Sequence, residues 1–181
     1  MNNKIVKLGV ILFLICAITA GVLGGVNELT KDRIYAINNA ATIAAYAAVL
    51  EADSYEEVEF DRAAFPTVDK LSKAAGDKGY VAELTVSGAQ GLITLAVGVG
   101  SDLKCTGISI ISHSETSGLG ANAAADSDIG RNFRAQFVGQ GEDIALSKSG
   151  GSIDALAGAT ITSNAVTGAV ATAIQAVKSL G

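Results

Sequence analysis

A run of 19 residues without a charged side chain, residues 8–26, most constrains what this chain of 181 residues can form. As a helix rising about 1.5 Å per residue, it would span roughly 28 Å, close to the hydrocarbon thickness of a bilayer. Lys4 and Lys7 precede the run, and Glu28 is the first acidic residue after it. The positive-inside rule therefore predicts a single-pass anchor in the cell membrane, with a cytoplasmic N-terminus and an extracytoplasmic domain.

A cleaved signal peptide is the alternative interpretation of the same segment. The apolar part of a signal peptide is normally shorter, and no clear Ala-x-Ala site follows it here. Val22-Leu23-Gly24 is only a passable substitute for such a site. We therefore expect residues 1–27 to remain as a transmembrane anchor.

Charge and cysteine content exclude several classes of partner and site. Residues 28–181 contain 11 basic and 18 acidic side chains, a net charge of −7, which argues against nucleic acid and anionic lipid headgroups as partners. Cys16 lies in the apolar run and Cys105 in a predicted strand, so we expect no disulfide framework and a core position for Cys105. The sequence shows no cluster of metal ligands.

The segment after the anchor is expected to be a helical stalk or connecting region over residues 28–66. Apolar residues recur near the helical period in residues 28–50, and alanine, the best helix former, is frequent there. The acidic run 51–61 is typical of a solvated surface. Pro66, the single proline, marks a turn or an edge.

The remaining domain, residues 67–181, is expected to contain a small antiparallel sheet. Strands are predicted over residues 80–87, 92–99 and 105–112, with a turn at 87–91 that makes the first two a hairpin. The short connections favour an antiparallel meander. A weaker signal suggests a short strand near residues 144–146.

Two helices complete the predicted fold class, α+β with an N-terminal transmembrane helix. Residues 126–138 are expected to form a short helix capped by Asp126 or Ser127, with Ile129, Phe133 and Phe137 on one apolar stripe. The final helix is expected over residues 162–180. Its apolar face would contain Val166, Val170, Ala173, Ile174 and Val177.

The segment Asp154-Ala-Leu-Ala-Gly-Ala-Thr160 carries the clearest chemical signal. Thr160 stands where the final helix starts, and a helix N-terminus offers unpaired N–H groups and the positive end of the helix dipole, which suit a phosphate. Gly158 and Ala159 are small enough to let a bulky group approach the backbone. The alternative interpretation is that Thr160 only caps the helix, as threonine commonly does.

This segment resembles the flavinylation motif Asp-x-x-Ser/Thr-Gly-Ala-Thr of the RnfG and NqrC family, in which FMN is esterified through its phosphate to the last threonine. The resemblance implies covalent FMN on Thr160, attached by a flavin transferase that uses FAD and a metal ion. It also implies that Asp154 is recognised by the transferase or fixes the loop. Ala157 stands where the motif has Ser or Thr, and Thr162, then Ser163, are the rival acceptors.

A second segment, His113-Ser-Glu-Thr-Ser-Gly-Leu-Gly120, resembles the His-x-Glu-Thr-Pro-Gly-Leu-Gly segment of the same FMN-binding domain. By this resemblance, Gly118 and Gly120 would permit positive φ and a close flavin approach, and Leu119 would pack on the isoalloxazine. Glu115 and Thr116 would hydrogen-bond its polar edge or the ribityl hydroxyls. His113, the single histidine, is expected to organise the loop rather than transfer a proton.

A third, weaker resemblance is carried by residues 131–139, which are similar to a short helix of the family that ends in Gln-Phe-x-Gly. Phe133 and Phe137 in this segment are expected to be core residues rather than a flavin platform. The anchor and the order of the three segments also match the family, and RnfG fits the chain length better than the generally longer NqrC.

The resemblance implies a covalent-FMN electron carrier in a membrane complex that passes electrons between ferredoxin and NAD and exports Na⁺ or H⁺. The chain has no dinucleotide fingerprint in a βαβ setting and no Cys-x-x-Cys, so NAD and iron–sulfur clusters would belong to other subunits. We expect no catalytic residues and no independent enzyme activity in this chain. The alternatives are an NqrC-like subunit of a Na⁺-pumping NADH:quinone reductase, a freestanding exported flavoprotein, and a non-redox assembly subunit.

Overall fold

A computed structural model describes residues 2–180, which divide between Ala40 and Ala41 into two compact units. Helix α1 (Asn2–Val49) is continuous because the sequence contains no proline before Pro66. Within the described residues, Val6–Glu28 is long and apolar enough to cross a membrane, and its side chains are exposed. This segment contains the apolar run 8–26 from which the anchor was predicted.

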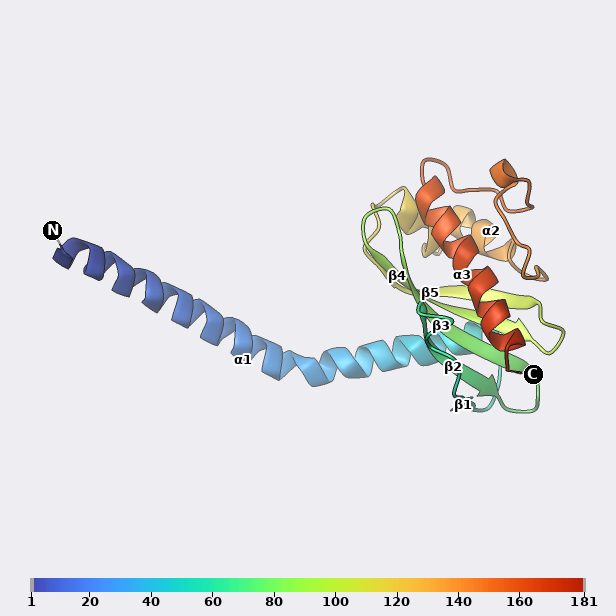
Figure 1. The fold of residues 1–181 in the computed structure, drawn as a ribbon, viewed down its shortest axis with the longest axis horizontal. Helices are drawn as coiled ribbons and strands as arrows, with labels where there is room; N and C mark the ends of the chain where they lie inside the picture. The colour runs from blue at the N-terminus through green and yellow to red at the C-terminus, as the bar shows by residue number, and fades with distance from the viewer. Residues whose placement is uncertain (1, 181) are drawn as a thin grey trace. The chain divides into compact units, whose positions relative to one another are not determined.

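The second unit contains a five-stranded antiparallel sheet in the order of the sequence, as Figure 1 shows. The strands are β1 (Tyr55–Glu57), β2 (Val68–Ala74), β3 (Gly79–Ser87), β4 (Leu92–Gly100) and β5 (Cys105–His113). Each strand pairs with the next one along the chain. The predicted meander and the predicted α+β class are therefore confirmed.

Strands β1 and β2 were not predicted from the sequence, and β1 lies in the region expected to be a helical connection. Helix α1 ends at Val49, and β1 occupies part of the acidic run 51–61. Only three residues of β1 pair with β2, too few for an alternating pattern to appear. In β2 a register shift between Val68 and Lys70 breaks the alternation of buried and exposed residues. Pro66 lies in the turn before β2, as predicted.

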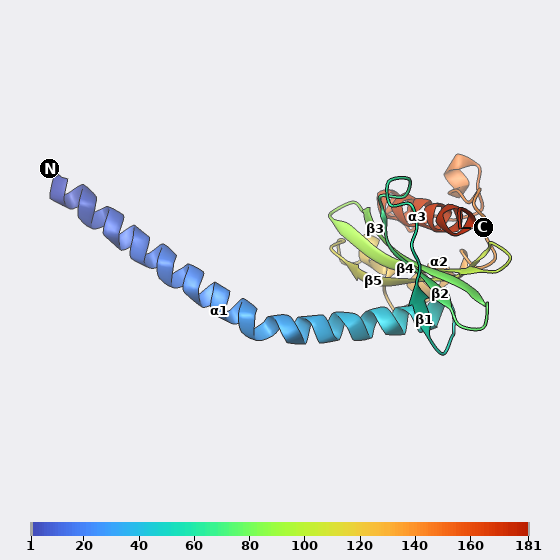
Figure 2. The same cartoon turned by 60° about the horizontal axis from the view of Figure 1, so that its bottom comes forward.

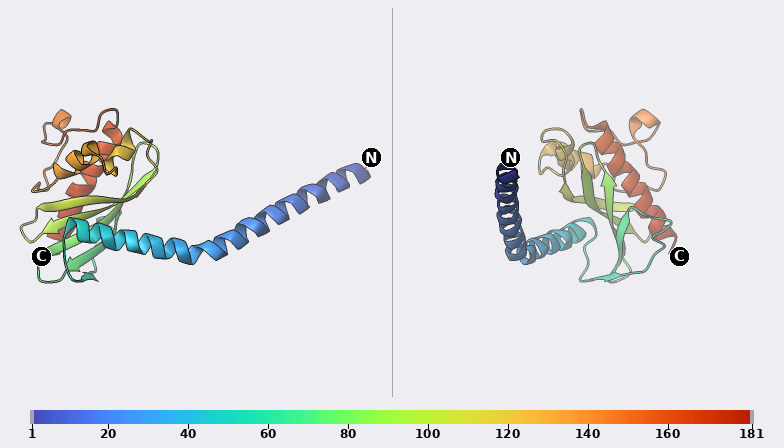
Figure 3. Two further views of the ribbon diagram at one scale, coloured as in Figure 1. Left: turned by 180° about the vertical axis from the view of Figure 1, so that it is seen from behind. Right: turned by 60° about the vertical axis from the view of Figure 1, so that its left-hand side comes forward.

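One face of the sheet carries the main core. Helix α3 (Thr160–Lys178), helix α2 (Asp128–Ala135) and the 3₁₀ turn η1 (Gly120–Ala123) lie on this side (Figure 3). The five apolar positions expected on the last helix are all buried in this core. Cys105 is buried there as well, as expected.

The opposite face of the sheet receives the last turns of α1 (Figure 2). Tyr46 donates a hydrogen bond to Glu83 at 3.0 Å, and Thr106 donates to the carbonyl of Val49 at 2.6 Å. Gly98 makes this close approach possible, because a Cβ there would lie 2.5 Å from the Val49 carbonyl oxygen. Residues 41–49 of the helix are therefore part of the domain.

Helix α2 is shorter than predicted, and one residue of its expected apolar stripe is not buried. Ser127 is the cap, because its side chain accepts a hydrogen bond from the Gly130 N–H at 3.3 Å. Phe133 and Phe137 are buried with ring centroids 5.2 Å apart, which confirms their core position. The expected place of Ile129 on the same buried stripe is wrong, since this side chain is 60% exposed.

The segment before α3 is mostly irregular. It contains the short 3₁₀ turn η2 (Ser147–Ser149) and a parallel bridge between Leu146 and Ile153. The strand expected near residues 144–146 is therefore reduced to this single bridge. Helix α3 begins at Thr160, two residues before the predicted start.

Candidate functional site

Thr160 is the first residue of α3, and its side chain is exposed. The N-cap position belongs to Ala159, which provides no side-chain hydrogen bond to the helix. The interpretation of Thr160 as a helix cap is therefore wrong. Within residues 2–180 the Thr160 hydroxyl has no hydrogen-bond partner, so it is free to react or to bind.

The start of α3 also presents unpaired backbone donors. The first N–H with a backbone acceptor is that of Ser163, which donates to the Ala159 carbonyl at 2.9 Å. The N–H groups of Thr160, Ile161 and Thr162 have no acceptor among the described residues. Together with the positive end of the helix dipole, these donors favour an anion beside Thr160.

The acceptor loop, defined as residues 154–159, is held from inside by Ser163. The Ser163 hydroxyl donates to the Ala159 carbonyl and accepts from the Leu156 N–H, each at 2.9 Å. Ser163 is fully buried, so this rival acceptor faces the core. The sequence offered no local signal for the contact between Ser163 and Leu156, which are seven positions apart.

Gln136 of the α2 segment holds the other end of the acceptor loop. Its side-chain oxygen accepts from the Asp154 N–H at 2.7 Å, and its amide nitrogen donates to the Asp154 carbonyl at 3.3 Å. The Asp154 carboxylate is exposed and has no partner within residues 2–180. Gln136 belongs to the segment that resembles the family's Gln-Phe-x-Gly, but its function as a loop anchor was not predicted.

The two small residues before Thr160 serve different purposes. Gly158 is exposed, has φ +71°, and would place a Cβ 3.0 Å from the Leu119 side chain, so a larger residue would be strained there. Ala159 is buried in the main core, which limits its size for packing rather than for access by a ligand.

The glycine loop, defined as residues 116–120, lies beside the acceptor loop through the contact of Leu119 with Gly158. The Thr116 carbonyl accepts from the N–H groups of Leu119 and Ala121, both at 3.2 Å. Gly118 has the expected positive φ, +77°. Thr116 is exposed, so its hydroxyl is available to a ligand.

Gly120 corrects the expectation of a second positive φ, because its backbone is not in that region. A Cβ at Gly120 would lie 2.6 Å from the Thr162 hydroxyl and would also collide with the Glu115 carboxylate. Glycine is needed there to make room for these two side chains.

Glu115 lies at the centre of the site and is only 9% exposed. Its carboxylate accepts from the Gln90 N–H at 2.9 Å and from the Thr162 hydroxyl. Burial by itself raises the pKa of Glu115, but hydrogen bonds from Gln90, Thr162 and neighbouring backbone N–H groups bring the pKa below its ordinary value. The carboxylate is therefore engaged inside the protein, whereas the sequence suggested that it would contact the flavin.

His113 is exposed, and its Nδ1 accepts from the Glu115 N–H at 3.2 Å. This contact joins two residues of the segment directly before the glycine loop and fits the loop-organising function expected for His113. Thr162, at 1% exposure, is buried behind Glu115.

Three exposed apolar side chains lie next to the acceptor loop: Leu119 at 43%, Ile129 at 60% and Ile161 at 65%. Ile129 also lines a shallow hollow of about 230 Å³ together with Asp154 and Ala157. Such an apolar rim beside unpaired N–H donors suits a ligand with a flat apolar part and an anionic end.

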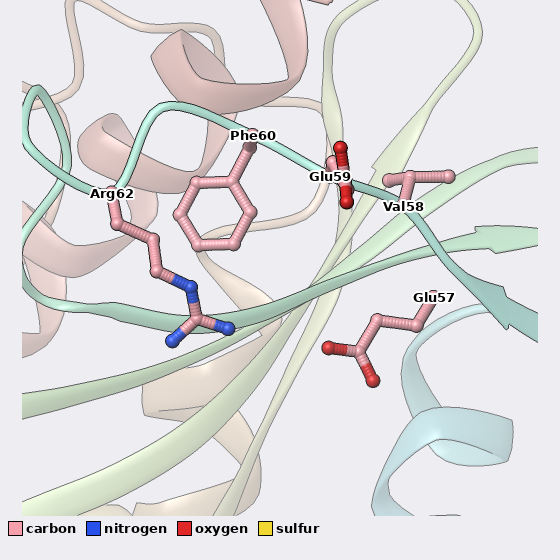
Figure 4. Close-up of a pocket in the computed structure, with 5 residues that line it drawn as sticks. All are labelled: Glu57, Val58, Glu59, Phe60 and Arg62. Atoms are coloured by element: carbon pink, nitrogen blue, oxygen red, sulfur yellow. The ribbon is translucent and has the colours of Figure 1, made fainter.

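A second hollow of about 530 Å³ lies away from these residues, in the segment after β1 (Figure 4). Its lining residues are Glu57, Val58, Glu59, Phe60 and Arg62. The Arg62 guanidinium lies 5.4 Å from the centre of the Phe60 ring. Within residues 2–180, no group of three or more His, Cys, Asp or Glu side chains could hold a metal ion.

Comparison with known proteins gives the class of this domain. The family described as "FMN-binding domain" matches residues 88–175, and the family described as "RnfG N-terminal region" matches residues 1–49. The first match contains the glycine loop, the acceptor loop and most of α3, and the second coincides with α1. The chain therefore contains an FMN-binding domain and, before it in sequence, a helix that is long and apolar enough to span a membrane.

Three relatives, all G subunits of oxidoreductase complexes, identify the family more closely. The one from the Na⁺-translocating ferredoxin:NAD⁺ oxidoreductase complex of Acetobacterium woodii is 31% identical over 96% of this chain and 92% of its own length. The one from the ion-translocating oxidoreductase complex of Methanosarcina acetivorans is 43% identical over 54% of this chain. The one from the proton-translocating ferredoxin:NAD⁺ oxidoreductase complex of Clostridium ljungdahlii is 40% identical over 60% of it.

The chain belongs to the RnfG family, the G subunits of ion-translocating ferredoxin:NAD oxidoreductase (Rnf) complexes. The matched regions span 50% of the Methanosarcina relative and 65% of the Clostridium relative, compared with 92% of the Acetobacterium relative.

Proposed function

We propose that this chain carries FMN covalently on Thr160 and transfers electrons as the RnfG component of an Rnf complex. The observation that carries the proposal is the exposed, unpartnered Thr160 hydroxyl at the uncapped start of α3, inside the segment matched by the FMN-binding family. A hydroxyl in this position is accessible to a modifying enzyme and lies beside donors that suit a phosphate.

The burial of neighbouring hydroxyls supports the choice of Thr160 over its rivals. Thr162 is 1% exposed and donates to Glu115, and Ser163 is fully buried and bridges Leu156 and Ala159. An enzyme that modifies a folded chain can reach Thr160 without opening the structure, but it cannot reach the other two.

The attachment reaction needs a second protein. A threonine hydroxyl is a weak nucleophile without a base, and no side chain within residues 2–180 hydrogen-bonds to that of Thr160. With FAD as donor, a flavin transferase would form the bond from Thr160 Oγ to the FMN phosphorus and break the pyrophosphate bond. AMP would leave, and the hydroxyl proton would pass to a base of the transferase. The exposed Asp154 carboxylate would be available for recognition by that enzyme.

The residues around Thr160 fit the attached group. The N–H groups of Thr160, Ile161 and Thr162 would stabilise the phosphodiester charge, by about 0.3–1 kcal/mol for a surface helix terminus. Leu119, Ile129 and Ile161 offer apolar surface for the rings, and the Thr116 hydroxyl and the glycine loop offer polar contacts. Bound FMN would supply the electron-transfer chemistry, while the protein orients it and sets its surroundings.

The names of the relatives support membership of a multi-subunit ion-translocating complex, and we propose that its other subunits include membrane and cluster-bearing proteins. One name specifies Na⁺ and another specifies protons, so the proposal for this chain includes either ion. The anchor would cross the membrane once at Val6–Glu28, with the N-terminus in the cytoplasm and the FMN-binding domain on the extracytoplasmic side.

The decisive experiment measures the mass of the full chain made with and without a flavin transferase and FAD. With the transferase, the chain should gain one FMN minus one water and give a fluorescent band in a denaturing gel. Thr160→Ala should abolish both signals and leave the fold intact, because the Thr160 side chain makes no hydrogen bond within the described residues. Thr172→Ala, on an accessible part of the same helix, is the matched control and should behave like the wild type. An unchanged mass of the wild-type chain, or a fluorescent Thr160→Ala band, would refute the assignment.

A further inference from the structure

We propose that Glu115 is a positioning residue for flavin attachment: it holds Thr162 and thereby fixes the first turn of α3 so that Thr160 faces outward. This inference rests on the proposed function, because it concerns the presentation of the acceptor hydroxyl. It assigns Glu115 a task inside the protein in place of direct contact with the flavin.

The Thr162 hydrogen bond is unusual within its helix. Ser163, Thr167 and Thr172 each donate their hydroxyl to the carbonyl four residues earlier, so the bonds that they donate stay local. Thr162 instead donates to Glu115, 47 residues away in sequence. The Ser163 hydroxyl also contacts the loop directly before α3, but the Thr162 hydroxyl ties the helix to a segment that is distant in sequence.

Glu115 extends this tie to a third segment. The carboxylate oxygen that does not accept from Thr162 accepts from the Gln90 N–H, in the turn between β3 and β4. Glu115 also directly precedes the glycine loop. One carboxylate thus joins the start of α3, the β3–β4 turn and the glycine loop beside the acceptor.

The surrounding glycines show that the structure is built around this carboxylate. A Cβ at Gly88 would collide with Glu115 and lie 2.7 Å from Ile93, and a Cβ at Gly120 would collide with Glu115 and Thr162. Both positions lack a side chain where the carboxylate needs space.

The geometry of the α-helix explains how the hydrogen bond from Thr162 to Glu115 orients Thr160. Residues along an α-helix are separated by about 100° of rotation, so residues 160 and 162 point about 160° apart. Holding Thr162 against the interior therefore directs Thr160 to solvent, as their burial shows. Loss of the tie would let the uncapped first turn rotate or fray, because Ala159 provides no cap.

The test compares rates of flavin attachment to the full chain with purified transferase and FAD. Thr162→Val removes the hydroxyl and keeps the shape, and it should lower kcat about tenfold while KM for the chain stays within about twofold. Thr162→Ser restores a hydroxyl and should recover most of the rate. Thr167→Val is the matched control, a similarly buried threonine five residues further along α3 that bonds only within the helix, and it should retain the wild-type rate.

A double-mutant cycle tests whether Glu115 and Thr162 act through one contact. Glu115→Gln combined with Thr162→Val should be little worse than the more damaging single variant, whereas Glu115→Gln combined with Thr167→Val should show multiplied effects. Equal rates for Thr162→Val, Thr162→Ser and Thr167→Val would overturn the inference. A wild-type chain that accepts no flavin would instead overturn the proposed function, so the two failures are distinguishable.

Discussion

Ser163→Ala should destabilise the domain and loosen the acceptor loop at the same time. The Ser163 hydroxyl is the acceptor for the Leu156 N–H, and Leu156 is itself buried. The Ala159 carbonyl, the other partner, would keep the backbone N–H of residue 163 as a donor. The substitution therefore leaves one buried donor without an acceptor, which costs about 1–3 kcal/mol.

This cost converts into a measurable change in melting temperature. For a domain of this size, about 2 kcal/mol corresponds to roughly 6–8 °C. Thermal unfolding of the full chain in detergent, followed by circular dichroism, would measure it. Thr167→Val is the control, since its hydroxyl donates to a carbonyl within the helix and its loss leaves no donor unpaired. Its melting temperature should fall by less than half as much.

The same two variants should separate loop anchoring from general stability. At a temperature where both are folded, Ser163→Ala should accept flavin more slowly than the wild type, and Thr167→Val should not. The reasoning fails if the two melting temperatures fall equally, or if Ser163→Ala loses stability but accepts flavin at the wild-type rate.

Two further predictions concern packing and pH. Gly98→Ala should cost about 1–3 kcal/mol in thermal unfolding, because its Cβ would collide with the Thr106 hydroxyl and would lie 2.5 Å from the Val49 carbonyl oxygen to which that hydroxyl donates. Gly168→Ala, with open space around it, should be neutral or stabilising, and similar effects of the two substitutions would contradict the close docking of α1. The pKa of Glu115 is lower in the folded protein than in the unfolded chain, where it is about 4.3. Ionised Glu115 therefore stabilises the fold above the unfolded pKa, and this stabilisation is lost as the pH falls through the folded pKa. Glu115→Gln should therefore lose less stability than the wild type on acidification in denaturant titrations, and parallel curves for the two proteins would exclude this contribution.

The sequence predicted those parts of the fold whose pattern is local. The three strands β3, β4 and β5 were predicted to within a residue at most ends, because each contains a long run of apolar or alternating residues. Strands β1 and β2 were missed since their residues are charged and their pairing is short or shifted. Sheet pairing stabilises them, and that pairing is not visible in either segment alone.

The candidate site shows the same division. Thr160 could be selected from the sequence because a helix start has local residue preferences, Gly158 because of its small size, and Gly118 because the segment that contains it resembles the family motif. The internal engagement of Glu115 could not, because its partners lie 25 and 47 residues away. The sequence identified Glu115 as a member of the site, but only the fold shows which way its carboxylate is turned.

This arrangement also explains why Ala157 can replace the hydroxyl residue that the family motif usually has before Gly-Ala-Thr. Ala157 is exposed, and the loop around it is held by Ser163 at one end and by Gln136 at the other. A hydroxyl at position 157 is therefore unnecessary for the conformation of the loop. The proposed acceptor, Thr160, has to be accessible yet held in place, and here Ser163 and Gln136 hold the loop before it without contacting the Thr160 side chain.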